Sequence, residues 1–201
     1  IWIYQHFRNH TLKEVVIPSR IRKVGMAAFA ECSSLENVTF EEGAEIIEPG
    51  AFAYSGIKKI KLPNTLKTIG AYAFVNCKNL EYVELPKGLT SIEKFAFSGC
   101  DNLKQISIPD TVSEIGIKIL GSNSVAEVIC NLENHIARYC RENNYRIFGF
   151  LTKDTVKGVR GEYVIPDKYT KIDSLAFSGN ENIREVTIPG SVKEIGERAF
   201  F

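Results

Sequence analysis

The sequence predicts an α/β repeat fold, a solenoid built from stacked coils of about 23 residues. The first observation is that two segments have nearly the same sequence: residues 69–86 read IGAYAFVNCKNLEYVELP, and residues 92–109 read IEKFAFSGCDNLKQISIP. The second is the dipeptide Ala-Phe, which recurs in steps of 23, 22 and 23 residues, then after a gap in a step of 23. It occurs at Ala28-Phe29, Ala51-Phe52, Ala73-Phe74, Ala96-Phe97, Ala176-Phe177 and Ala199-Phe200. A fixed period of this length is typical of repeat architectures, in which each coil buries its apolar edge only against its neighbours.

Each coil is expected to begin with a short strand. Apolar residues alternate with polar ones just before a proline, as in Val83, Leu85 and Pro86. This alternation gives a strand one buried face, and proline ends the ladder because it has no N–H to donate. The proline column comprises Pro18, Pro63, Pro86, Pro109, Pro166 and Pro189, with Glu41 in its place once. We expect these strands to lie parallel on one face of the solenoid.

The second half of each coil is expected to return the chain along the opposite face. A branched aliphatic residue stands five positions before each Phe, at Val24, Ile47, Ile69, Ile92, Ile172 and Ile195. Apolar residues at spacings near one helical turn indicate turns or short helices here. The phenylalanines then form a ladder of rings along the interior.

Residues 131–150, NLENHIARYCRENNYRIFGF, do not follow the repeat. Leu132, Ile136, Tyr139 and Cys140 fall on one helical face, which predicts a non-repeat helix near 131–144 that covers the solenoid wall. We expect one solenoid over residues 1–201, with a first repeat block at 12–130, the helical insert at 131–150 and a second block at 151–201. The glycine-punctuated start of the second block predicts a hairpin-like stretch before Ile165.

The composition is that of a soluble globular chain, with 44% apolar and 24% charged residues. A formal charge of +1 gives no broad field to attract nucleic acid, and no run is apolar enough to enter a membrane. The chain lacks an initiator Met and stops in mid-repeat at Phe201. We therefore expect a trimmed piece of a longer protein, with either further repeats beyond Phe201 or a frayed end.

The sequence predicts no catalysis, no cofactor and no metal. It contains none of the common nucleophile, metalloprotease, phosphate-loop or dinucleotide motifs. One repeat column holds cysteine at Cys32, Cys77 and Cys100. Other coils have Ser, Gly or Asn there, so we interpret these cysteines as small buried residues at a tight turn. Cys130, His135 and Cys140 match no common structural zinc spacing, and a fourth ligand is missing.

The complete pattern, L-x-x-I-x-[IL]-P-x-x-[LV]-x-x-I-G-x-x-A-F-x-x-C, is clearest at Leu80–Cys100 and Leu103–Ile115. It resembles the treponemal-type leucine-rich repeat of the BspA-like bacterial surface proteins, over about residues 12–130 and 161–201. The resemblance implies a curved leucine-rich-repeat solenoid, extracellular or at the cell surface, that serves adhesion and protein binding. The alternatives are a structural spacer, or the recognition arm of a larger surface protein or wall-associated enzyme.

The outward residues of the strands predict where a protein partner binds. One row runs Glu14, Asn37, Lys59, Tyr82, Gln105, Glu127, Glu185, and the other runs Val16, Thr39, Lys61, Glu84, Ser107, Ile129, Thr187. Tyrosine is favoured at binding hot spots. The predicted binding residues are therefore Lys59, Lys61, Tyr82, Glu84 and Gln105. The sequence leaves open the identity of the partner and the oligomeric state.

Overall fold

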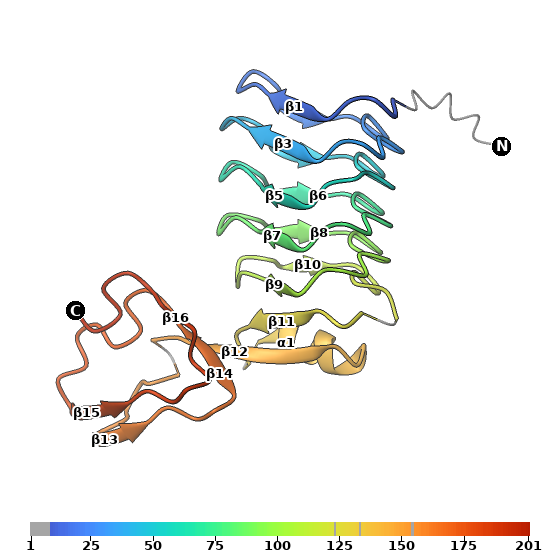
Figure 1. Ribbon diagram of the computed structural model, residues 1–201. Coiled ribbons are helices and arrows are strands. Elements are labelled where there is room, and N and C mark those ends of the chain that lie inside the picture. Colours follow the sequence, from blue (N-terminus) through green and yellow to red (C-terminus); the bar gives the residue numbers. More distant parts are fainter. Residues whose placement is uncertain (1–8, 123, 133, 154) are drawn as a thin grey trace.

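The computed structural model describes residues 9–122, 124–132, 134–153 and 155–201, which form a parallel solenoid of about eight turns (Figure 1). The main sheet has nine parallel strands in the order β1-β3-β5-β7-β9-β11-β12-β14-β16. Their bounds are β1 (Glu14–Ile17), β3 (Asn37–Phe40), β5 (Lys59–Lys61), β7 (Tyr82–Glu84), β9 (Gln105–Ser107), β11 (Glu127–Cys130), β12 (Arg146–Leu151), β14 (Tyr169–Ile172) and β16 (Glu194–Ile195). The predicted face of parallel strands is confirmed.

The return half of each first-block coil contributes a two-residue strand to a second parallel sheet, in the order β10-β8-β6-β4-β2. These strands are β2 (Lys23–Val24), β4 (Ile46–Ile47), β6 (Thr68–Ile69), β8 (Ser91–Ile92) and β10 (Glu114–Ile115). Turns follow each of them, as predicted, but the described return segments contain no short helix.

Left-handed residues on both sides of the buried phenylalanine explain why the return segments are not helical. Around Phe74, φ is 57° at Tyr72 and 54° at Asn76. Such residues interrupt a right-handed helix. The backbone bonds to the next coil instead, because the N–H of Phe74 donates to the carbonyl of Ala96 at 2.7 Å. The return segment is therefore held by its neighbours in the stack.

The predicted ladder of phenylalanine rings is confirmed. Ring centroids lie 5.3 Å apart for Phe29–Phe52, 5.3 Å for Phe52–Phe74 and 5.2 Å for Phe74–Phe97, with nearly parallel planes. Phe52 and Phe74 have no exposed surface. Pairs at such separations contribute about 0.5–1.5 kcal/mol beyond their burial. The ladder thus connects successive coils through the core.

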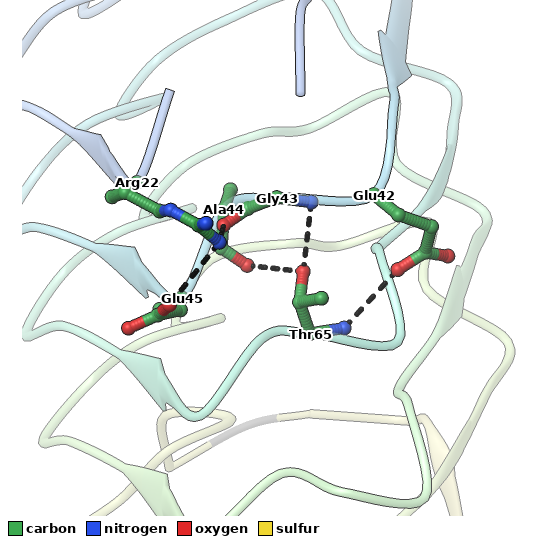
Figure 2. Close-up of polar contacts among 6 residues, drawn as sticks. All are labelled: Arg22, Glu42, Gly43, Ala44, Glu45 and Thr65. Carbon is green, nitrogen blue, oxygen red and sulfur yellow. Dashed lines mark hydrogen bonds and ion pairs between the residues drawn. The ribbon is translucent and has the colours of Figure 1, made fainter. Parts of the chain in front are cut away.

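The coil in which Glu41 replaces the proline forms its corner through polar contacts. The N–H of Glu41, which proline would lack, donates to the preceding coil at 2.9 Å. Figure 2 shows the hydroxyl of Thr65 donating to the carbonyl of Ala44 at 2.8 Å and accepting from the N–H of Gly43 at 3.0 Å. A Cβ at Gly43 would lie 2.0 Å from the carbonyl oxygen of Ser19, so the close approach of the coils requires glycine there.

Helix α1 (His135–Glu142) is the predicted non-repeat helix. Asn134 caps it, since its side-chain oxygen accepts from the N–H of Ile136 at 3.0 Å and from the following N–H. Ile136 and Cys140 are buried and Tyr139 is partly buried, so the helix and these parts of its predicted face are confirmed. Leu132, which was predicted to lie on the same helical face, comes before the helix begins.

The helix is held against the coil that contains β10, the last strand of the second sheet. The hydroxyl oxygen of Tyr139 accepts from the N–H of Ile119 at 3.0 Å. That of Tyr145, beyond the helix, accepts from the N–H of Leu120 at 3.3 Å. The N–H of Leu120 stands in the column of Phe74, whose N–H bonds to the next coil in the first block, so Tyr145 replaces that partner.

After α1 the chain re-enters the main sheet out of phase with the repeat. β12 pairs with β11, and β14 and β16 continue the same sheet. β14 and β16 contain Ile172 and Ile195, whose column forms the second sheet in the first block. The column that precedes proline forms β13 (Gly161–Val164) and β15 (Ile183–Thr187), which pair in a separate sheet. The two strand columns therefore exchange places in the second block, which packs around its own core containing Phe177.

The prediction of a hairpin-like stretch before Ile165 is wrong. β13 pairs in parallel with β15, which lies one repeat further along the chain. The physical reason is the insert, because α1 returns the chain to the main sheet at Arg146 before a full coil is completed. The second block consequently resumes in a different register, and a register shift between Gly149 and Phe150 accompanies the change.

Candidate binding face and cleft

The register of the main sheet brings the five predicted binding residues together. Lys59 lies opposite Tyr82 and Lys61 opposite Glu84, and Tyr82 in turn lies opposite Gln105. All five side chains are exposed, because alternate residues of a strand point to opposite faces. They form one continuous surface across β5, β7 and β9.

The far end of the two predicted rows differs from the prediction. Glu127 is followed in the first row by Arg146 of β12, whereas Glu185 and Thr187 belong to β15 in the separate sheet. Ile129, predicted to face outward, is only 5% exposed and belongs to the main core. The insertion of β12 beside β11 explains both corrections, since it replaces the repeat at that position.

A cleft of about 870 Å³ lies over this face. All five predicted binding residues line it, together with Phe150 of β12 and Lys171, Asp173 and Glu194 of the second block. Figure 1 shows the second block, in orange and red, set at an angle to the stack of first-block coils. Sequence reasoning missed the residues of the second block, because the repeat columns place Lys171 and Glu194 on the return side. The only signal was the break in periodicity at 131–150.

Tyr82 lies in the cleft with 45% of its surface exposed. The ammonium nitrogens of Lys59 and Lys104 lie 5.4 and 5.2 Å from its ring centroid, within the range of cation–π attraction. Lys104 also forms an ion pair with Glu81 at 3.0 Å, which holds the pKa of that carboxyl below its usual value and raises the pKa of Lys104. The ring is thus restrained by two lysines, one from each side of β7, while nearly half of the residue stays exposed.

The cysteines occupy packing positions, as predicted. Cys77 and Cys100 are buried, and their thiols donate to the carbonyls of Phe52 and Phe74, each at 3.1 Å. Contact with the Cys77 thiol, together with burial, raises the pKa of Cys100. Protonated, buried thiols of this kind are inert packing groups.

The described residues contain no group of three or more side chains suited to hold a metal ion. Nε2 of His135 lies 2.8 Å from the carbonyl oxygen of Val112, so this nitrogen has a backbone partner. Among the same residues, no helix has the length and apolar character that a membrane span requires.

A parallel solenoid with a proline-ended strand and a buried phenylalanine in its coils is a leucine-rich-repeat architecture of a distinct type. The model of the BspA type leucine rich repeat region matches residues 4–136 and 161–201, with six copies. The chain belongs to this family. Comparison with curated protein sequences found no match.

Two solved structures show the same fold, and a third is similar in sequence over part of the chain. A leucine-rich repeat protein from T. pallidum matches with a TM-score of 0.56 at 24% identity, over 92% of this chain and 73% of that one. The pneumococcal vaccine antigen PcpA matches with a TM-score of 0.53 at 20% identity, over 94% of this chain and 48% of PcpA. A leucine-rich repeat protein from Bacteroides capillosus is 32% identical over 43% of this chain and 62% of that chain, with a TM-score of 0.40. This chain therefore spans about half to three quarters of these relatives.

Proposed function

We propose that this chain is a protein-binding module of a bacterial cell-surface or secreted protein, used for adhesion or partner interaction and without catalytic activity. The observation that carries the proposal is the cleft over β5, β7 and β9, which contains all five residues of the predicted binding face. Ligand sites in proteins are typically concave in this way.

The rigidity of the face supports binding of a macromolecule. Its strands are held on both sides by parallel pairing, and Tyr82 is restrained by two lysines. A preorganised surface loses little conformational entropy when a partner binds. A half-exposed tyrosine beside charged residues is also the composition that hot spots favour.

The chemistry of the cleft supports the absence of catalysis. Its described lining contains neither histidine nor cysteine. The raised pKa values of Tyr139, Tyr145 and Cys100 belong to groups of the core, where burial favours the protonated form. The surface location is supported by membership of the BspA type family and by the similarity in fold to a vaccine antigen.

A binding screen tests this function. The chain is presented to host matrix proteins, mucosal proteins and bacterial surface proteins, beside a variant carrying Lys59→Glu, Lys61→Glu and Tyr82→Ala. We expect a partner whose affinity falls at least about tenfold in the variant, since hot-spot truncation costs about 2 kcal/mol or more. Equal melting temperatures of the two proteins establish that the loss is local.

Three results would count against the proposal. A partner bound equally by both proteins would place the interaction elsewhere on the solenoid. No partner across the panel, from well-folded protein, would favour the structural spacer instead. An activity of an adjoining domain that depends on this chain would favour the recognition arm of a larger protein.

A further inference from the structure

The lysines around Tyr82 differ in whether a carboxylate neutralises them. Lys58 pairs with Glu36 and Lys104 pairs with Glu81, each at 3.0 Å. In the second block, Lys171 pairs with Glu194. These pairs join neighbouring coils and leave little net charge for a ligand.

Three other lysines of the cleft lack such a partner. Lys59, Lys61 and Lys87 all line the cleft and are exposed. Among the residues that the structure describes, none of the three has a carboxylate oxygen within 4.0 Å. Lys59 and Lys61 lie two positions apart on β5 and point to the same side, and Lys87 lies just beyond the proline that follows β7. The first-block side of the cleft therefore carries three lysines that form no ion pair among the described residues.

Most carboxylates of the cleft have a hydrogen-bond or ion-pair partner within the chain. Asp110 accepts hydrogen bonds from the side-chain amides of Asn131 at 3.3 Å and Asn134 at 2.8 Å. Asp173 accepts from the N–H of Ser174 at 2.9 Å. Glu84 is the carboxylate that lies directly among the lysines. Hydrogen bonds from neutral donors leave these carboxylates charged, so the lining as a whole has four lysines and four carboxylates. The excess of positive charge is local, where Glu84 is the carboxylate beside Lys59, Lys61 and Lys87.

We propose, on the basis of the proposed function, that the cleft binds an acidic peptide segment of the partner. Carboxylates of that segment face Lys59, Lys61 and Lys87, and an apolar side chain packs on the exposed part of Tyr82. The cleft supplies apolar contact as well, through Leu85 and Phe150. Complementary charge of this kind speeds association and selects the partner.

A nucleic acid fits this cleft less well than an acidic peptide. A phosphate backbone presents regularly spaced negative charge, which would meet the carboxylates of Glu84, Asp110, Asp173 and Glu194 along the lining. A peptide can instead place its acidic residues at the lysines and other residues at the carboxylates. The occupant is therefore a polypeptide with locally clustered acidic side chains.

The test uses a labelled glutamate-rich peptide with a central phenylalanine, and a twin in which glutamine replaces every glutamate. Binding is measured by fluorescence anisotropy at low and at physiological salt. The face variant carries Lys59→Glu and Lys61→Glu. The control carries Lys23→Glu and Lys78→Glu, which change the net charge equally at exposed positions outside the cleft.

We expect the full chain and the control to bind the acidic peptide, and the face variant to bind it at least about tenfold more weakly. Affinity should also fall with salt, because exposed charges are screened. No binding, equal loss in both variants, or equal binding of the glutamine twin would overturn the inference. A screen partner that requires the same face but binds independently of salt would likewise overturn it, while leaving the proposed function intact.

Discussion

At the scale of single residues, the position after each second-sheet strand alternates between glycine and glutamate. The sequence has Gly25, Glu48, Gly70, Glu93 and Gly116 there. Each glutamate bonds to the backbone of the preceding coil, as Glu93 does when it accepts from the N–H of the residue after Gly70 at 2.9 Å. Glycine leaves the space that this contact and the close backbone approach require.

Substitution of Gly70 tests this interpretation. A Cβ at Gly70 would lie 2.7 Å from the backbone nitrogen of Pro49 and 2.8 Å from the carbonyl oxygen of Ile47. We expect Gly70→Ala to lower the free energy of unfolding by about 1–3 kcal/mol, the usual cost of overpacking. The matched control is Gly25→Ala, where a Cβ meets nothing within 4 Å and a gain of up to about 1 kcal/mol is expected. Urea denaturation measures both, and equal effects would contradict the contact.

At the scale of elements, α1 replaces the next coil as the partner of the β10 coil. The contacts of Tyr139 in α1 and of Tyr145 beyond it differ from the backbone bonds between coils, since phenolic oxygens accept the N–H groups of Ile119 and Leu120. Burial raises the pKa of both Tyr139 and Tyr145. The free energy of unfolding should therefore depend on pH in the alkaline range, where tyrosine titrates.

The sign of that dependence follows from the raised pKa values. The unfolded state loses its tyrosine protons near pH 10, while the folded state keeps them to higher pH. The free energy of unfolding should be unaffected by these groups below that pH and should fall as the pH rises above it. Tyr139→Phe should be less stable by about 1–3 kcal/mol at neutral pH, because the N–H of Ile119 loses its partner. Its alkaline loss of stability should be smaller than that of the wild type, and urea denaturation across pH measures the difference.

Elements with a repeating pattern were predictable, and those defined by an interruption were not. Alternation before proline fixes the face of Tyr82 and Lys59, because a strand with one buried face has only one way to pack. The apolar spacing of Ile136, Tyr139 and Cys140 predicted the helix. The exchange of strand columns was not predictable, since Ile172 and Val186 look the same in sequence as their first-block equivalents and only the pairing with β12 separates them.

At the scale of the whole molecule, this exchange creates the candidate site. In an uninterrupted solenoid, the outward face of β5, β7 and β9 would be an open surface. Phe150 of β12 and Asp173 of the second block lie beside it and convert the surface into a cleft. The part of the cleft formed by β5, β7 and β9 was therefore predictable from the repeat. The part formed by β12 and the second block was not, because it depends on the insert.

Hydrogen–deuterium exchange of the full chain, with and without a partner from the screen, is the most direct test of the proposal that this cleft binds protein. The corner turns that line the cleft, which contain Asn64, Lys87 and Asp110, should become protected on binding. Protection should extend to the segment around Asp173 in the second block. Protection confined to the opposite turns around Tyr54 and Tyr72, with the cleft unchanged, would contradict the proposed site.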